Sequence, residues 1–200
     1  MKKFKPTILK TNLLAVALIS MFAATSCNND MSTKDSQEIA ETSNEAKFSN
    51  TMENDAEFLV SAAELNYEEI ELGKLAQING SMPEVKELGK MMEVEHTKAL
   101  NDLKTLAAKK EITIPATITD KGKSAYDKLK VKSGTDFDKE YCNMMVKGHK
   151  DAISKFEKGN SDSKDADIKA WAETTLISLR AHLDYGIACE EKCKKMKSKS

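Results

Sequence analysis

The chain has 200 residues, of which 40% are apolar, enough to bury one hydrophobic core of ordinary size. Glycine and proline are scarce, at 8 and 3 residues, whereas Lys, Glu, Ala and Leu abound, which is typical of an all-α protein. The formal net charge is −1, so no excess of basic residues points to a nucleic-acid partner.

Residues 1–26 have the features of a lipoprotein signal peptide. Four lysines precede an apolar run over residues 13–24, which is short for a membrane span. The run leads into Ala24-Thr25-Ser26-Cys27, which resembles the lipobox of bacterial lipoproteins. That resemblance implies cleavage before Cys27 and lipid on its thiol and new amine. The alternatives are an ordinary cleaved signal peptide with a chance cysteine and an uncleaved membrane anchor.

Lipidation of Cys27 would determine the cellular location of the protein. Two or more acyl chains hold a protein firmly to a bilayer, so the membrane is the expected partner of this residue. We therefore expect a membrane-anchored lipoprotein of the cell envelope of a Gram-negative bacterium. The expected site is the outer membrane, on its periplasmic or its surface face.

Residues 27–54 are polar and contain few large apolar side chains. Such a segment cannot bury enough surface to offset the loss of chain entropy. We predict a flexible tether, with at most a transient helical turn around residues 37–47, followed by a helical domain over residues 55–196.

Apolar residues at helical spacing predict two long helices in the first half of this domain, over about residues 54–78 and 83–109. Gly80 is expected at a left-handed position that ends the first helix. Ser81 and Glu84 predict a capping box at the start of the second. Because the loop is short, the two helices are expected to be antiparallel neighbours.

The second half repeats this arrangement after one long connection, over residues 110–135, with a short helix predicted from about residue 119. Two further long helices are predicted from about residue 135 to 158–162 and from 165 past 193. Two antiparallel hairpins joined by one long crossover have the connectivity of ferritin-like bundles. The predicted fold is therefore an all-α, ferritin-like four-helix bundle.

Glu69, His96, His149 and His182 each lie on the apolar stripe of a different predicted helix. A polar side chain there costs free energy unless it finds a partner. Imidazole and carboxylate groups are ordinary ligands for Zn, Mn, Fe or Cu, and a bundle core can take one ligand from each helix. A di-iron centre needs two Glu-x-x-His pairs, and only Glu93-x-x-His96 fits. The alternative is that these histidines are core residues bonded to protein neighbours.

Counting residues from the two hairpin loops predicts the level of each of these side chains along the axis of the bundle. His96 lies opposite residue 66, within one turn of Glu69. His149 is expected some six residues from the level of His182, which at ~1.5 Å per residue is about 9 Å. We therefore predict a polar Glu69–His96 centre, and a complete metal site depends on where the other two histidines settle.

Three cysteines lie in the predicted bundle: Cys142, Cys189 and Cys193. Cys142 comes seven residues before His149, and Cys189 comes seven after His182, so the cysteines are level if these histidines are. An exported protein meets an oxidising compartment, where Cys142 could form a disulfide with Cys189 or Cys193. Alternatively, Cys189 and Cys193, one helical turn apart, could bind a soft metal.

Four stretches resemble the signatures of a known family. They are EIELGKLA at 69–76, PEV at 83–85 with EHTK at 95–98, FDKEY at 137–141 with MV at 145–146 and His149, and Leu176 with HL at 182–183. Together they resemble the bacterial "domain of unknown function 4142" family, often labelled as outer-membrane proteins. The resemblance implies a ferritin-like fold, export and no established activity. The chain departs from the family at Glu95, Gly148 and Ile177, where aspartate, an acidic residue and proline are usual.

The sequence favours a lipid-anchored cell-envelope protein whose helical module serves structure or interaction. The first alternative is a metal-binding or metal-sensing protein that holds a divalent transition metal in a Glu/His core site. The second is an envelope enzyme, although no serine or cysteine nucleophile constellation is present. Protein partners and the oligomeric state are left open.

Overall fold

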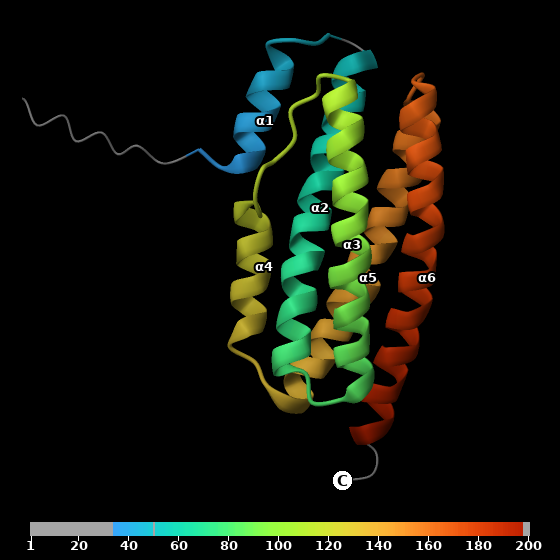
Figure 1. Cartoon of the computed structure of the whole chain (residues 1–200). Helices are drawn as coiled ribbons and strands as arrows, with labels where there is room; N and C mark the ends of the chain where they lie inside the picture. The colour runs from blue at the N-terminus through green and yellow to red at the C-terminus, as the bar shows by residue number, and fades with distance from the viewer. Residues whose placement is uncertain (1–33, 50, 198–200) are drawn as a thin grey trace, which may run out of the picture. The chain divides into compact units, whose positions relative to one another are not determined.

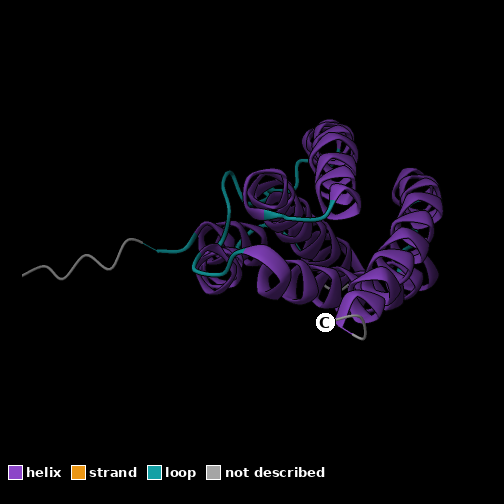
Figure 2. Ribbon diagram, turned by 90° about the horizontal axis from the view of Figure 1, so that it is seen from below, coloured by secondary structure: helices purple, strands orange, loops and turns teal. Residues whose placement is uncertain are grey.

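The structure is a computed structural model that describes residues 34–49 and 51–197. The predicted leader and Cys27 lie outside the described residues. Within the described part the chain forms helices and no strand, so the predicted all-α class is confirmed (Figures 1 and 2). The helices are α1 Ser36–Glu45, α2 Thr51–Asn79, α3 Pro83–Lys109, α4 Asp120–Lys130, α5 Gly134–Asp162 and α6 Ala166–Lys197. None of the described helices combines the length and apolarity that a bilayer crossing requires.

Four long helices form a bundle of two antiparallel hairpins (Figure 1). α2 packs along α3, and α5 packs along α6, as the short connections between them require. α3 also packs on α6, and α2 on α5, which closes the bundle. The shorter α1 and α4 both pack against α2, outside the four-helix core. The long connection with its short helix, predicted over residues 110–135, is therefore present.

The predicted tether is wrong from Ser36 onward, because α1 belongs to the folded domain. Its Ala40 and Asn44 are buried. The Asn44 amide donates to the carbonyl of Thr113 over 2.7 Å, and its oxygen accepts from the Thr113 N–H over 2.8 Å. The Ser36 hydroxyl accepts from the Ala116 N–H over 2.8 Å. These partners lie 69 and 80 residues away in the sequence, so the composition of the segment alone does not reveal them.

The α2–α3 turn differs from the predicted one. Among the described residues, positive φ occurs at Glu111 and Gly134, both at 58°, so Gly80 is not left-handed. Glycine is needed at position 80 because a Cβ there would lie 2.6 Å from the Ala76 carbonyl oxygen. The Ser81 hydroxyl does not cap α3, and donates instead to the buried carboxylate of Asp138 on α5.

Asp138 takes the place of the predicted capping box. Its carboxylate accepts from the backbone N–H of Ser81 over 2.9 Å and from that of Met82 over 3.1 Å. Met82 is the N-cap residue of α3 and makes no capping bond through its own side chain. A buried carboxylate needs several donors, and the N-terminus of a helix offers unsatisfied N–H groups. This contact ties the first hairpin to the second.

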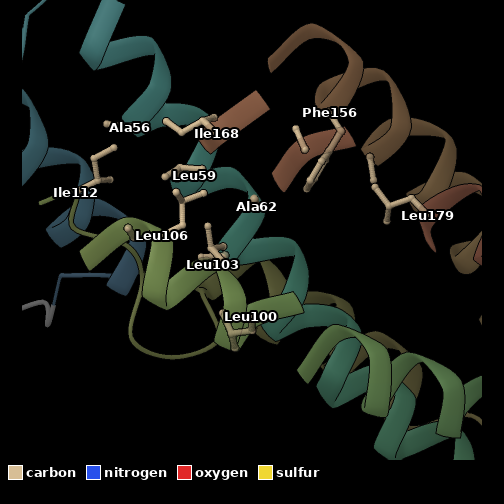
Figure 3. Packing of buried hydrophobic residues seen from close by; sticks show 14 of the residues in the cluster. Ala56, Leu59, Ala62, Leu100, Leu103, Leu106, Ile112, Phe156, Ile168 and Leu179 are labelled. Carbon is tan, nitrogen blue, oxygen red and sulfur yellow. The ribbon is translucent and has the colours of Figure 1, made fainter. Parts of the chain in front are cut away.

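Buried apolar side chains form two clusters along the bundle. The first contains side chains from α2, α3, α5 and α6 (Figure 3), among them Leu59, Leu103, Phe156 and Leu179. The second cluster consists of residues that come earlier in α3 and α5, and later in α6, than those of the first cluster. On each of these three helices, one histidine lies between the residues of the first cluster and those of the second.

Candidate metal centre

His96 on α3, His149 on α5 and His182 on α6 meet in the layer between the two apolar clusters. The ring centroids are 5.7 Å apart for His96 and His149, 5.2 Å for His96 and His182, and 5.3 Å for His149 and His182. One ring nitrogen from each lies within 4.8 Å of the other two. The side chains are 3%, 1% and 2% exposed, in chain order. We call these residues the histidine cluster.

The predicted offset between His149 and His182 is wrong, because the nearest nitrogens of these rings are 3.3 Å apart. α5 continues through Gly159 to Asp162, and α6 begins at Ala166. The turn of the hairpin is therefore centred later in the chain than the polar stretch around Gly159 suggests. The count assumed a turn near residue 162, whereas residues 163–165 form it. Each residue of displacement at a hairpin turn changes the counted level of the partner by two residues, which removes about half of the offset.

Each ring of the histidine cluster directs one nitrogen to an acceptor outside the cluster. His96 Nδ1 lies 3.0 Å from Asn66 Oδ1, and the Asn66 amide group donates to the Ala62 carbonyl over 2.7 Å, which orients this side chain. His149 Nδ1 lies 2.9 Å from the Met145 carbonyl oxygen. His182 Nε2 lies 2.8 Å from a carboxylate oxygen of Glu95.

These outer acceptors set the tautomer of each ring. A carbonyl, an amide oxygen and a carboxylate can only accept, so the outer nitrogen of each neutral imidazole must carry the proton. The inner nitrogens, Nε2 of His96, Nε2 of His149 and Nδ1 of His182, then carry lone pairs. His96 Nε2 is buried without a hydrogen-bond partner. Three lone pairs therefore face a shared volume in the core.

The surroundings favour the neutral form of His96 and of His149. Burial, followed by the neighbouring His149 and His182, holds the pKa of His96 well below its ordinary value. Burial and the neighbouring His182 lower the pKa of His149 to about 4, although the Met145 carbonyl acts in the opposite direction. Neutral imidazole is the form that binds metals.

Glu69 does not join the histidine cluster, and the predicted Glu69–His96 centre is wrong. His96 is level with residue 66, as the counting predicts, and bonds to Asn66 instead. Glu69 Oε2 is buried without a hydrogen-bond partner, and burial followed by the charge of Glu68 raises the pKa of Glu69 well above its ordinary value. Its carboxyl group lines a cavity of about 570 Å³ between α2 and α5, beside Gly148.

Glu93 also lies outside the histidine cluster, because its carboxylate accepts from the Gln77 amide over 2.7 Å. Two residues that the sequence did not single out as site residues hold the rings instead: Asn66 and Glu95. The height of His96 pointed to position 66, but nothing in the sequence pattern marked an asparagine there as its partner. Glu95 stands out only as a departure from the family pattern.

Cys142, Cys189 and Cys193 are buried free thiols. Cys142 lies seven residues from His149, and Cys189 lies seven residues from His182. The Sγ atoms of Cys142 and Cys189 are 2.8 Å apart, and those of Cys142 and Cys193 are 3.8 Å apart. The prediction that level histidines imply level cysteines is therefore confirmed. The disulfide between Cys142 and one of the other two stays a prediction.

The fold and site define a helical bundle protein with two buried clusters of side chains, one of histidines and one of cysteines, that could each hold a metal ion. The chain belongs to the family described as a domain of unknown function (DUF4142), whose model matches residues 37–186. The predicted family is thus confirmed, and the matched region begins within α1 and includes the whole histidine cluster. No curated protein and no solved structure matches the chain. The ferritin-like character of the bundle and the export of the protein stay predictions.

Proposed function

We propose that the protein binds one divalent transition-metal ion through His96, His149 and His182. The observation that carries this proposal is the convergence of three inner nitrogens while every outer nitrogen has an acceptor. Three neutral imidazoles with an open fourth position are a known ligand set for zinc, and imidazole also suits copper, iron and nickel. The open position is available to water or a small ligand.

The outer hydrogen bonds support this function beyond their effect on tautomers. Metal-binding histidines usually donate their second N–H to a carboxylate, a carbonyl or water, which fixes the ring and raises its basicity. The Glu95 carboxylate serves His182 in this way, and the Met145 carbonyl serves His149. Glu95 also lines a groove of about 230 Å³ with His96 and His182, which offers a path for an ion between α3 and α6.

The same geometry argues against a purely structural role for these histidines. A core histidine that only stabilises the fold should have both ring nitrogens bonded to protein groups. Leaving a buried polar group unsatisfied costs about 1–3 kcal/mol. His96 Nε2 is unsatisfied. In the neutral tautomers that the outer acceptors require, the facing nitrogens of His149 and His182, 3.3 Å apart, both carry lone pairs. A cation bound between the rings would give each of the three inner nitrogens a partner.

Metal stoichiometry tests this proposal. We expect the full chain with Cys27→Ser to bind one equivalent of Co²⁺ or Zn²⁺, as measured by elemental analysis and calorimetry. The near-ultraviolet spectrum of bound Co²⁺ should lack thiolate charge-transfer bands. His149→Ala should abolish binding, and Glu95→Gln should weaken it by about 10–100-fold because it removes an outer partner. The bound metal should raise the melting temperature.

The matched control is Glu69→Gln, since Glu69 is a buried acidic residue outside the histidine cluster. This variant should keep one equivalent of metal. Binding of less than a tenth of an equivalent by the parent protein, with unchanged melting on addition of Zn²⁺, Mn²⁺, Cu²⁺ or Fe²⁺, would refute the proposal. Loss of binding in a folded Glu69→Gln variant would also refute it.

We further propose that lipid on Cys27 anchors this bundle to a membrane of a Gram-negative cell envelope. The lipobox-like sequence supports this, and only residues 28–35 would separate the lipid from α1. Cells grown with a labelled fatty acid should incorporate the label into the protein and fractionate it with membranes. Cys27→Ser should lose both properties, whereas Cys142→Ser should keep them. A labelled Cys27→Ser protein would contradict the anchor.

A further inference from the structure

A second cluster, made only of sulfur atoms, lies one heptad from the histidines. The sulfur cluster consists of Cys142 on α5, Cys189 and Cys193 on α6, and Met82 at the start of α3, all of them buried. One Sγ atom from each cysteine lies within 4.8 Å of the other two. The thioether of Met82 lies 3.4 Å from Cys193 Sγ. Elements from both hairpins therefore bring four sulfurs together.

We propose that the sulfur cluster binds a copper(I) ion through the three cysteine sulfurs, with the Met82 thioether as an additional ligand. Thiolate and thioether groups are soft ligands that select Cu(I) among biological cations. The thioether distinguishes copper from zinc here, because structural zinc sites use cysteine and histidine rather than methionine. A trigonal sulfur site uses all three thiols, whereas a disulfide uses only two of them.

The surroundings suit a buried soft cation. The second apolar cluster, which includes Phe137, Tyr141 and Met92, encloses the sulfurs and keeps water away from them. Each thiol that becomes a ligand releases its proton to solvent. The positive charge of Cu(I) offsets part of the thiolate charge that this creates.

The sulfur cluster is independent of the histidine cluster. Seven residues separate Cys142 from His149, and seven separate His182 from Cys189. On a helix that spacing is about 10 Å, too far for one ion to contact both sets of ligands. Soft and borderline metals should therefore divide between the two clusters, and variants of one cluster should leave the other functional.

The test is an anaerobic titration of the reduced full chain with Cu(I), in competition with the chromophoric chelator bathocuproine disulfonate. The parent carries Cys27→Ser, so that its only thiols are those of the sulfur cluster. We expect one tightly bound Cu(I), an ultraviolet thiolate-to-copper band and a sulfur-only first shell by X-ray absorption. Cys142→Ser and Cys189→Ser should each lose the band and at least 100-fold in affinity, whereas His149→Ala should keep both.

Met82→Leu tests the thioether without a large change in volume, and Met92→Leu is its matched control in the same apolar cluster. We expect about tenfold weaker Cu(I) binding in the first and none of that loss in the second. Helical circular dichroism and melting confirm that each variant folds. Cu(I) binding that survives in both cysteine variants overturns the proposal. So does a stoichiometric Cys142–Cys189 disulfide in protein isolated from its envelope without reductant.

Discussion

Gly73→Ala should destabilise the protein by about 1–3 kcal/mol, although alanine is the better helix former by about 1 kcal/mol. Gly73 on α2 faces Gly89 on α3, where the two backbones meet. A Cβ at position 73 would lie 2.6 Å from the Gly89 carbonyl oxygen and 2.9 Å from the Glu93 nitrogen. Both are backbone atoms, so relief requires a shift of a whole helix. Urea unfolding followed by circular dichroism measures the loss.

Gly148→Ala is the matched control, because it is also a helical glycine in the bundle. The nearest atom to a Cβ there is Glu69 Oε1 at 3.5 Å, an ordinary van der Waals contact. This variant should be as stable as the parent, or more stable by up to about 1 kcal/mol. Surface substitutions usually change the free energy of unfolding by no more than about 0.5 kcal/mol. If the free energy of unfolding of Gly73→Ala also lies within that range of the parent value, the close contact between α2 and α3 does not contribute to stability.

The Gly73 variant also links packing to the candidate metal centre. α3 carries His96 one turn beyond Glu93, so moving α3 away from α2 moves this ring relative to His149 and His182. Metal ligands tolerate only small displacements, since useful distances hold within about 0.2 Å. Metal affinity should therefore fall in Gly73→Ala even where the variant remains folded, and Gly148→Ala should leave it unchanged.

Helical periodicity was sufficient to predict the all-α class and the four long helices, because burial on one face follows directly from spacing. Leu88, Met92 and Tyr141, for example, lie on predicted stripes and are fully buried. The sequence predicted only a transient helical turn where α1 lies, because the stability of a short polar helix depends on distant partners, here Asn44 with Thr113. Local composition contains no information about such partners.

The site was only partly predictable, for a geometric reason. The apolar stripes indicated that three histidines face the core, and they do. Whether the three histidines meet depends on the positions of the hairpin turns. The polar stretch around Gly159 indicates that a turn is near, but it does not show which residue is at the centre of the turn. The outer partners are harder still, because Glu95 reaches His182 from a different helix.

Acidification should destabilise the metal-free protein through its neutral core histidines, and His149 gives the clearest case. Its folded pKa is about 4, below the ordinary value of 6.5. The unfolded chain therefore binds a proton at His149 between these values while the folded protein does not. The stability that this residue contributes is fully present above pH 6.5 and is lost as the pH falls toward 4. The loss is about 3 kcal/mol, at about 1.4 kcal/mol per pH unit.

The measurement is the difference in unfolding free energy between the parent and His149→Gln, from urea titrations between pH 7 and 4 with a chelator present. Taking this difference cancels titrating groups that behave alike in both proteins, such as Glu69. The parent should lose about 3 kcal/mol relative to the variant. For Glu69→Gln, the difference in unfolding free energy should change with pH in the opposite direction. Burial raises the pKa of the Glu69 carboxyl, so this residue destabilises the parent as the pH rises above 4.5. A pH-independent difference for His149→Gln would mean that this ring is already hydrated or protonated in the folded protein, and a dry cluster of three neutral ligands would then be ruled out.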